Sequence, residues 1–264
     1  MELEALKQTF KPRLGSPTSG VIVTGGASGI GLASAHALAA VGRPVALWDL
    51  KATEAQTRAK EIAAEFGVPV LGLGVDVRDP AAVRESAAAT RAKLPSIGGI
   101  VHCAGTVDTG SLEGITVENW AAGIDVHLRA IVLLLQACLE DLRRQRGSAV
   151  VAIASINATL GNAVNPIYSA AKGGVLSLVR SLADRLARDG IRINSVSPGQ
   201  IVTPMMQPAL EALPGHFEKR ILLGRIGLAE EIGRVVRFLL SDEASYVTAA
   251  EFIVDGGNVS SQRT

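Results

Sequence analysis

A tyrosine and a lysine stand four positions apart in the stretch NPIYSAAKGG, residues 165–174. On a helix these positions share one face, so the phenol of Tyr168 and the ammonium of Lys172 would be neighbours. A free phenol has a pKa near 10 and is a poor base at neutral pH. A positive charge about 4 Å away, at an effective dielectric constant of roughly 20, favours the phenolate by about 4 kcal/mol, partly offset by desolvation. We therefore expect Lys172 to lower the pKa of Tyr168 and make it a usable general base. The alternative is a surface pair whose lysine stem covers apolar residues.

Ser155 ends the apolar run SAVVAIAS, residues 148–155, and precedes the tyrosine. A hydroxyl at this place would polarise a substrate oxygen or stabilise a developing alkoxide. It could equally be a strand-end hydroxyl that bonds nearby backbone. Together with the phenol and the ammonium, Ser155 completes a set able to move a proton on or off an alcohol oxygen, which hydride transfer requires.

The stretch VIVTGGASGIG contains Gly25, Gly29 and Gly31 in the spacing G-x-x-x-G-x-G. These glycines would let the backbone turn tightly and approach a pyrophosphate, which the amides of the opening helix would hold. Asp49 follows at the end of the next apolar run, where an acid accepts hydrogen bonds from an adenosine ribose. Residues 27–28 are not basic, so there is little provision for a 2′-phosphate, and NAD is favoured. The glycines alone could mark only a tight turn, and the acid could be a helix N-cap.

The elements that must position these residues alternate along the chain. Helical stretches separate short, nearly all-apolar runs at residues 20–25, 44–50, 68–77, 98–105, 148–155, 191–199 and 251–257. Strands that are apolar throughout are typical of a sheet buried on both faces. The sequence therefore predicts an α/β fold, a parallel sheet with helices on both faces.

We interpret residues 1–264 as a single domain, because no linker or change of composition divides the chain. Residues 1–19 form an irregular lead-in. Residues 200–227 interrupt the alternation and contain Pro204, Pro208 and Pro214. A segment that breaks the pattern near the carboxyl ends of strands is a candidate substrate lid.

The composition excludes several classes of function. A net charge of +1 without a basic cluster predicts no nucleic-acid partner. The apolar run at residues 131–139 is too short and interrupted to span a bilayer, and the N-terminus lacks the apolar core of a signal peptide. Two cysteines, Cys103 and Cys138, are consistent with a reducing compartment, so a cytoplasmic location is expected. The four histidines lack metal-ligand spacing, so no metal site is predicted.

As an ordered set, these residues resemble the classical short-chain dehydrogenase/reductase family over residues 18–258. The matching motifs are TGGASGIG (24–31), Asp49, DV (76–77), AG (104–105), Ser155, Tyr168-x-x-x-Lys172, PG (198–199), VTP (202–204) and VDGG (254–257). The resemblance implies a Rossmann-type, doubly wound parallel sheet of seven strands. It also implies a nicotinamide cofactor and the reversible oxidation of an alcohol to a carbonyl.

The resemblance also assigns the cofactor contacts residue by residue. The pyrophosphate would lie along Gly25, Ser28, Gly29, Ile30 and Gly31, and the adenosine near Asp49, Asp76, Val77, Ala104 and Gly105. The nicotinamide side would be held by Tyr168, Lys172, Pro198, Gly199, Ile201 and Thr203. We expect substrate contacts from Ser155, Tyr168, Asn157, Thr159, Asn162 and Val107, with residues 205–220 closing over them.

Two positions depart from the family pattern. His102 and Cys103 stand where the family commonly has two asparagines, which would alter the support of the turn. His127 stands where the family usually has its fourth catalytic residue, an asparagine that holds a water linked to the lysine. A neutral imidazole can donate and accept at once, and repulsion from Lys172 should lower the pKa of His127. We expect a relay through this side chain; alternatively, the ring packs into the core and the backbone carbonyl alone serves the relay.

The predicted function is that of an NAD-dependent oxidoreductase acting on a secondary alcohol or ketone, with Tyr168, Lys172, Ser155 and His127 as catalytic residues. Two alternatives stay open: an isomerase or dehydratase of the same fold, and a cofactor-binding regulator with a silent active site. The helices around residues 131–139 and Tyr168 look too apolar for a monomer's surface. In the family the corresponding helices pair between subunits, so a homotetramer is expected, with a dimer as second choice.

Overall fold

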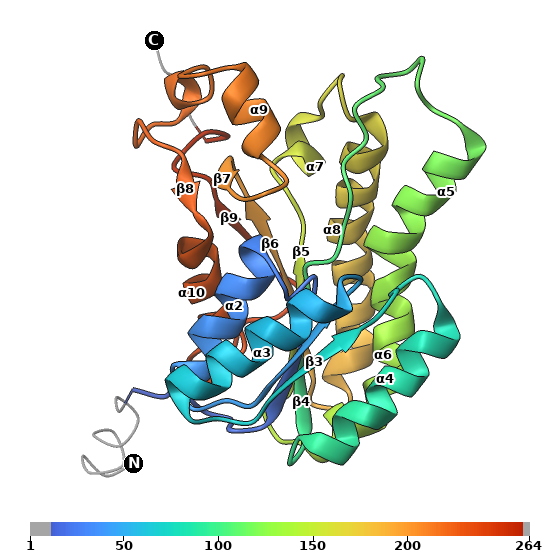
Figure 1. The fold of residues 1–264 in the computed structure, drawn as a ribbon, viewed down its shortest axis with the longest axis vertical. Helices are drawn as coiled ribbons and strands as arrows, with labels where there is room; N and C mark the ends of the chain where they lie inside the picture. The colour runs from blue at the N-terminus through green and yellow to red at the C-terminus, as the bar shows by residue number, and fades with distance from the viewer. Residues whose placement is uncertain (1–11, 261–264) are drawn as a thin grey trace.

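The computed structural model describes residues 12–260, so residues 1–11 of the predicted lead-in lie outside the described residues. The described residues form a parallel sheet of seven strands in the order β3-β2-β1-β4-β5-β6-β9 (Figure 1). The strands are β1 (Gly20–Thr24), β2 (Val45–Asp49), β3 (Val70–Gly74), β4 (Ile97–His102), β5 (Ala149–Ile153), β6 (Arg192–Pro198) and β9 (Glu251–Val254). Each lies within one of the seven apolar runs or begins one residue before it, so the predicted sheet is confirmed.

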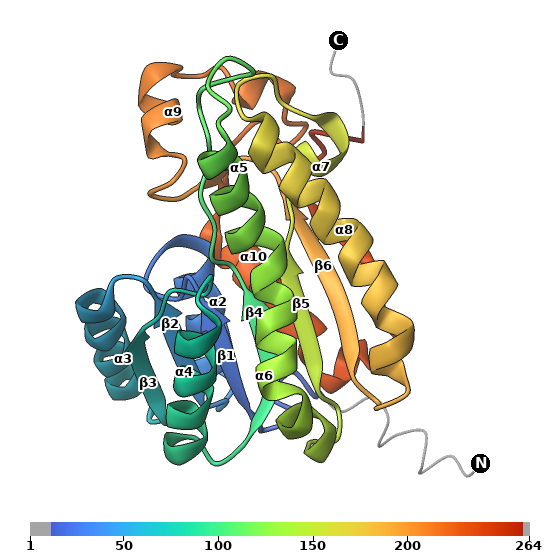
Figure 2. The same ribbon diagram turned by 90° about the vertical axis from the view of Figure 1, so that its right-hand side faces the viewer.

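Helices cover both faces of the sheet (Figure 2). One face carries α2 (Gly29–Ala39), α3 (Ala52–Phe66) and α10 (Ala229–Leu239); the other carries α4 (Pro80–Lys93), α6 (Ala130–Arg144) and α8 (Pro166–Ala187). Strand side chains alternate between the two cores: Ile22 packs toward α6 and α8, while Val21 and Val23 pack toward α2 and α10. Burial on both sides explains why the strands read as continuous apolar runs.

The strand order reverses between β1 and β4. From β1 the chain winds outward to β2 and β3, then returns to place β4 on the other side of β1. At such a reversal the connections leave in opposite directions, and a crevice opens beyond the carboxyl ends of the strands. The predicted glycine stretch follows β1 and the AG turn follows β4, so both border this crevice.

One helical run of 28 residues joins α5 (Val117–Ile124), a π-helical turn η1 (Asp125–Arg129) and α6. In the described part of the chain, this is the one run long and apolar enough to cross a membrane by length and composition alone. Its residues Ile131, Leu134 and Cys138 are buried in the core against the sheet, as in a core helix. The sequence patterns did not predict the π turn.

Residues 200–227 form an excursion above the carboxyl end of the sheet (Figure 1). It contains β7 (Ile201–Val202), α9 (Gln207–Ala212) and η2 (Glu218–Arg220), and it reaches β8 (Gly227–Leu228). Strands β7 and β8 pair with each other, which ties the two ends of the excursion together. The interruption of the main sheet was expected, but this second small sheet was not. The remaining short helices are α7 (Asn157–Leu160) and η3 (Asp242–Ala244).

Candidate active site

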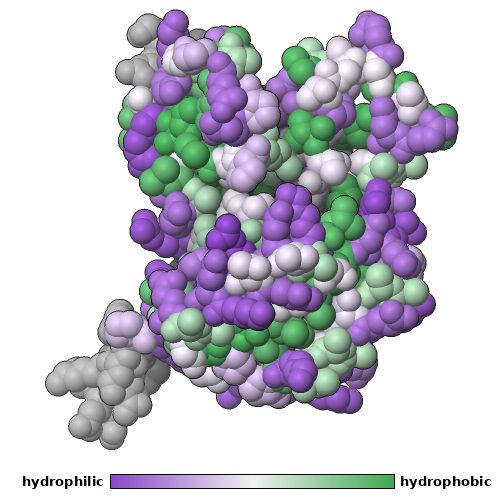
Figure 3. Space-filling view, in the orientation of Figure 1, coloured by the Kyte–Doolittle hydropathy of each residue, from purple (hydrophilic) through white to green (hydrophobic). Residues whose placement is uncertain are grey.

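A cavity of about 380 Å³ lies at the crevice beyond β1, β2, β4 and β5. The face drawn in Figure 3 is hollowed between the α9 region and the α5 region. The sixteen predicted cofactor residues include thirteen that line this cavity: Gly25, Ser28, Gly29, Ile30, Gly31, Asp49, Asp76, Val77, Ala104, Gly105, Tyr168, Lys172 and Thr203. Pro198, Gly199 and Ile201 are outside the lining. The structure thus brings the glycine stretch, the acid and the Tyr–Lys pair to one site.

The glycine stretch has the close backbone packing that the spacing predicted. Gly25 has a φ of 63°, a conformation that favours glycine. A Cβ on Gly31 would lie 2.1 Å from the carbonyl oxygen of Gly25, so no side chain fits there. Within the described residues, the N-cap Ser28 makes no side-chain capping hydrogen bond to α2. The amide-rich start of this helix therefore fits an anionic group such as a pyrophosphate.

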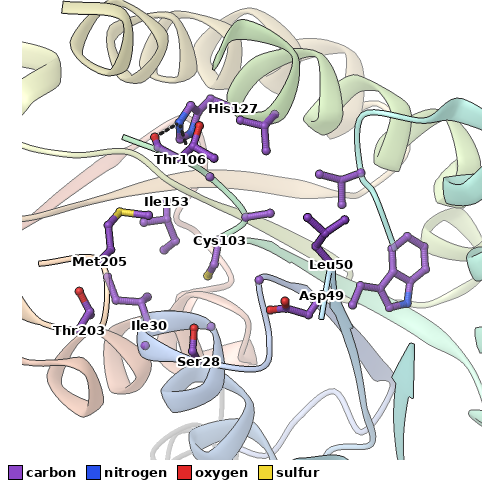
Figure 4. A pocket seen from close by; sticks show the side chains of 18 of the residues that line it. Ser28, Ile30, Asp49, Leu50, Cys103, Thr106, His127, Ile153, Thr203 and Met205 are labelled. Carbon is purple, nitrogen blue, oxygen red and sulfur yellow. Dashed lines mark hydrogen bonds between the residues drawn. The ribbon is translucent and has the colours of Figure 1, made fainter. Parts of the chain in front are cut away.

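Asp49 lies at the end of β2, near Ser28 in Figure 4. Its carboxylate accepts hydrogen bonds from the amides of Ala27 and Lys51, both at 3.1 Å, which fix its orientation beside the cavity. Asp76, further along the wall, pairs with Arg78 at 2.7 Å, and this hydrogen bonding lowers the pKa of Asp76. Arg78 also lines the cavity, and sequence reasoning did not single it out.

Tyr168 and Lys172 lie on the first two turns of α8 and share the cavity wall, as their spacing predicted. The Lys172 ammonium is buried, lies 5.5 Å from the centre of the Tyr168 ring and donates to the carbonyl of Ile153 at 2.5 Å. Burial lowers the pKa of Lys172 to about 8. Ser155 is buried two residues beyond β5, and hydrogen bonding by its side chain lowers the pKa of Tyr168. The phenol, the hydroxyl and the ammonium therefore lie close together.

The expected lowering of the tyrosine pKa is wrong for the protein as it stands. Burial raises the pKa of Tyr168, and the hydrogen bond from Ser155 lowers it by less. The sequence argument assumed that the lysine charge outweighs desolvation. Instead the ammonium is directed to the Ile153 carbonyl, and the phenol is enclosed by the cavity wall, which disfavours its charged form. In this state Tyr168 is a protonated phenol.

His127 lies in the π turn η1 and faces the cavity (Figure 4). Its Nε2 lies 2.8 Å from the carbonyl oxygen of Thr106, and its ring packs edge-on against the Tyr168 ring at 5.4 Å between centres. Nε2 also lies 3.3 Å from the amide nitrogen of Thr106. A neutral ring can make only one of these two hydrogen bonds through Nε2, and the shorter contact, to the carbonyl, assigns the proton to Nε2. Nδ1 is then an acceptor, and it is buried without a hydrogen-bond partner among the residues that the structure describes.

The imidazole is neutral, as expected. Burial lowers the pKa of His127 to about 2, and the charge of Lys172 is the second cause rather than the first. The ring also fills the space over Gly105, where a Cβ would lie 2.3 Å from Cε1 of His127. The imidazole therefore packs closely between the AG turn and the ring of Tyr168.

His102 supports the turn in place of the family's asparagine. Its Nε2 lies 2.9 Å from the carbonyl oxygen of Val126, and its Nδ1 lies 2.9 Å from the hydroxyl of Thr24. That hydroxyl also accepts the amides of Cys103 and Ala104, each at 3.2 Å. Burial lowers the pKa of His102 to about 3. The neutral ring joins β1, the AG turn and the π turn.

Of the predicted substrate residues, Tyr168 lines the cavity, whereas Ser155, Asn157, Thr159, Asn162 and Val107 are outside the lining. Asn157 bonds Ser155 through its amide at 3.1 Å and Asn165 through its side chain at 3.3 Å. Asn162 is exposed, and its side chain accepts the amide of Val164 at 2.9 Å. Thr159 and Val107 are exposed as well. Their contacts with substrate stay a prediction.

Several lining residues were missed by sequence reasoning. An apolar part of the wall is formed by Ala122, Val126 and Ile153, together with Pro204 of the VTP motif and Met205 of the expected lid. The first three belong to no motif, and their place in the lining depends on how distant segments meet. Cys103 also lines the wall; burial raises the pKa of its thiol to about 12. A thiol that stays protonated in this way serves as a small apolar residue rather than as a nucleophile.

Comparison with known proteins extends over nearly the whole chain. A family model described as enoyl-(acyl carrier protein) reductase matches residues 25–258. A probable galactose dehydrogenase of Rhizobium meliloti is 36% identical over 240 residues, which are 90% of this chain and 94% of that protein. The 3-oxoacyl-[acyl-carrier-protein] reductase of Salmonella typhimurium is 33% identical over 236 residues, 89% of this chain and 95% of that protein.

Among solved structures, L-sorbose reductase from Gluconobacter frateurii superimposes with a TM-score of 0.88 at 27% identity. The match covers 94% of this chain and 99% of that one, and that structure holds NADPH and L-sorbose. The three similar proteins thus share the fold, while their names point to different carbonyl and alcohol substrates.

Proposed function

Because the chain belongs to the classical short-chain dehydrogenase/reductase family of oxidoreductases, whose members bind a nicotinamide nucleotide, we propose that it transfers a hydride between NAD(H) and a secondary alcohol or ketone. The observation that carries the proposal is that Tyr168 and Lys172 line one cavity whose far end is the glycine stretch, with the buried Ser155 acting on the phenol from behind the lining. A cofactor-binding regulator would have no need of a phenol bonded to a serine beside a buried ammonium.

The proton step follows from these residues. A bound nicotinamide ring supplies the hydride acceptor or donor and, when oxidised, a positive charge. In the reducing direction the protonated Tyr168 donates its proton to the carbonyl oxygen, while the Ser155 hydroxyl stabilises the developing alkoxide. In the oxidising direction Tyr168 takes the proton from the alcohol, for which its raised pKa must fall. The buried charge of Lys172 and the Ser155 hydrogen bond both act in that sense.

Asp49 supports a preference for NAD over NADP. Its two oxygens are oriented by backbone amides at the cavity wall, where a 2′-phosphate would meet a carboxylate instead of a cation. Arg78 is the cation closest along the chain to the predicted adenosine contacts, and it is paired with Asp76. The sorbose reductase with its NADPH shows that the same fold accepts the other cofactor.

We assign His127 the role of a water anchor in the proton relay. Its Nε2–H is directed to the Thr106 carbonyl, which cannot take the proton onward. Its pKa of about 2 also keeps the ring from accepting one. The free acceptor Nδ1 fits a donor such as a water that also contacts Lys172. The imidazole would then hold the relay water rather than pass the proton through itself.

The remaining expectations about the whole molecule are also part of this proposal. Residues 1–264 form one domain, and residues 200–227 act as a lid, since Thr203, Pro204 and Met205 already line the cavity. A homotetramer, or failing that a dimer, is supported by the edge strand β9 with its half-exposed Ile253 and by the fully exposed Tyr246. A cytoplasmic location agrees with the free thiols of Cys103 and Cys138.

The test is a panel of secondary alcohols and ketones offered with NAD(H) and NADP(H), with the absorbance of the reduced nicotinamide followed over time. We expect turnover with at least one alcohol–ketone pair and its loss in Tyr168→Phe. Turnover of a substrate without a change in that absorbance would instead favour isomerase or dehydratase chemistry. Cofactor binding without turnover of any compound would favour the regulator.

A further inference from the structure

The catalytic helix α8 begins without a local cap. Pro166 occupies its first position and has no N–H, and the N-cap Asn165 makes no side-chain capping hydrogen bond within the described chain. The Asn165 side chain instead accepts from Asn157. The first intrahelical bond runs from the amide of Ser169 to the Asn165 carbonyl at 3.0 Å. Two amides of the first turn, those of Ile167 and Tyr168, therefore need acceptors from elsewhere.

A carboxylate from a distant loop supplies both acceptors. Asp108 follows the AG turn after β4, 60 residues before the tyrosine. Its Oδ1 accepts the amide of Tyr168 at 2.8 Å and its Oδ2 accepts that of Ile167 at 3.2 Å. A negative charge at a helix N-terminus is stabilised by the helix dipole, and hydrogen bonds to an ionised acceptor are the strong ones. The first turn of α8 is thus capped in full by Asp108.

Asp108 belongs to a short segment, residues 106–111, that we call the strap. The strap bonds three parts of the site. At its start, the carbonyl of Thr106 accepts the Nε2–H of His127. In its middle, Asp108 caps α8. At its end, the amide and hydroxyl of Ser111 donate to the carbonyls of Val164 and Ala163, at 3.1 and 2.9 Å.

The last residue of the strap, Ser111, has an unusual backbone conformation. Ser111 has a φ of 54°, which a serine adopts at some cost unless surrounding bonds hold it. Its two hydrogen bonds to the segment before α8 supply that support. The strap therefore fixes a loop, a helix start and an imidazole relative to one another.

We propose that Asp108 is a positioning residue for the reaction, which holds the phenol of Tyr168 at a set place relative to His127 and the AG turn. The inference rests on the role proposed above for Tyr168. Tyr168 is the third residue of its helix, in a turn that frays when its amides lack acceptors. Lys172 lies a turn deeper and has its own anchor at the Ile153 carbonyl. Loss of Asp108 would therefore release the phenol and leave the ammonium in place.

A cap that served stability alone would behave differently, and α4 provides the matched control. That helix also begins with a proline, Pro80, and its cap Asp79 accepts the amide of Ala81 at 2.8 Å. The variants are Asp108→Ala, Asp108→Asn and Asp79→Ala. Each is assayed for kcat, substrate KM and cofactor Kd at a temperature well below its own Tm. Amide hydrogen exchange is measured at Ile167 and Tyr168.

For Asp108→Ala we expect kcat to fall about tenfold to a hundredfold, because a misplaced catalytic group costs rate directly. Cofactor Kd should stay within about threefold, and exchange at the two amides should rise at least about tenfold. Asp108→Asn keeps one acceptor oxygen and should recover most of the rate. Asp79→Ala should lower Tm to a similar degree but leave kcat within about twofold.

The proposal is overturned if Asp108→Ala loses stability as Asp79→Ala does while its kcat stays at the parent value. It is also overturned if exchange at Ile167 and Tyr168 does not change. A failure of the proposed function is distinguishable, because it shows as an inactive parent or an active Tyr168→Phe. In that event the exchange measurement alone still decides whether Asp108 holds the turn that carries Tyr168.

Discussion

The two ends of the cavity are built in different ways. At the nucleotide end, the glycine turn, the start of α2 and Asp49 come from one contiguous stretch, and Asp49 is oriented by the amides of Ala27 and Lys51. At the catalytic end, Ser155, Tyr168, Lys172 and His127 come from the segment after β5, from α8 and from the π turn, and the strap bonds the π turn to the start of α8. Figure 4 shows the contrast, with Ser28 and Asp49 at one end and Thr106 with His127 at the other.

The difference indicates how far the effect of a substitution should extend at each end. The nucleotide end is formed by backbone amides and by glycines without side chains, so a single substitution there alters a local shape or a local charge. Long-range hydrogen bonds and ring packing form the catalytic end, so a change there propagates between segments. Substitutions can therefore probe either end by itself or the coupling between the two.

The largest effect is expected from Tyr168→Phe, which removes the proton carrier at the catalytic end but little volume. We expect kcat to fall by roughly 10²–10⁴, as is typical when a general acid or base is lost. Cofactor Kd should change little, because the nucleotide end is untouched. Steady-state kinetics and cofactor titration measure the two separately. Near-normal turnover would remove Tyr168 from the mechanism.

The contrast also explains what the sequence could predict. The glycine stretch and Asp49 were predictable because their contacts are local and their chemistry depends on spacing. The strands were predictable because burial on both faces makes them apolar throughout; residues 44–50, for example, contain β2. The β7–β8 pair has two residues in each strand, too few to show a periodic pattern.

At the catalytic end the residue types could be identified from the sequence, but their hydrogen-bond partners could not. Nothing near Asp108 in the chain indicates that its carboxylate caps a helix 60 residues away. The protonation of Tyr168 was misjudged for the same reason. Burial depends on every segment that encloses the phenol, whereas the spacing to Lys172 is visible in one stretch.

A substitution at the junction of the two ends tests their coupling. In Gly105→Ala the new Cβ would lie 2.3 Å from Cε1 of His127, a ring that is buried and bonded to Thr106. We expect kcat/KM to fall about a hundredfold through misplacement of the turn and the ring. In a His127→Ala background the same change should cost far less, and a double-mutant cycle measures the difference. Equal costs in both backgrounds would show that the two ends are independent here.

Asp49 gives a test confined to the nucleotide end. NAD should be preferred over NADP by at least about tenfold in kcat/KM, which corresponds to about 1.4 kcal/mol. Asp49→Ser should reduce that preference without lowering kcat at saturating cofactor, since the catalytic end is unchanged. Parallel kinetics with both cofactors measure it. An equal efficiency of the parent enzyme with NAD and NADP would refute the assignment.

His127 gives the corresponding test at the catalytic end. His127→Asn keeps a polar side chain that can accept from a water, and it should retain most of the activity. His127→Leu has no acceptor and should lose about tenfold or more in kcat while it remains folded. Circular dichroism and thermal unfolding establish the fold of both variants. A folded leucine variant as fast as the parent would mean that the imidazole is packing only.

The last test concerns the dependence of stability on pH rather than the rate, and it too probes the catalytic end. His127 and His102 have pKa values near 2 and 3 in the folded protein, because both rings are buried and face the charge of Lys172. In the unfolded chain a histidine has a pKa near 6.5. Below that pH the unfolded chain binds protons at these histidines and the folded protein does not. The stabilisation is therefore fully present above about pH 6.5 and is lost as the pH falls toward the pKa values of the folded state. Each histidine should lower the free energy of unfolding by about 1.4 kcal/mol per pH unit in that window.

The free energy of unfolding, measured with urea between about pH 6 and pH 4, should therefore fall less steeply with decreasing pH for His127→Asn than for the parent. The difference in slope should equal roughly the contribution of one histidine. Carboxylates contribute equally to both proteins and cancel in the difference. An unchanged slope would mean that His127 takes up a proton in the folded state as readily as in the unfolded chain, and the lowered pKa assigned to this ring would then be wrong.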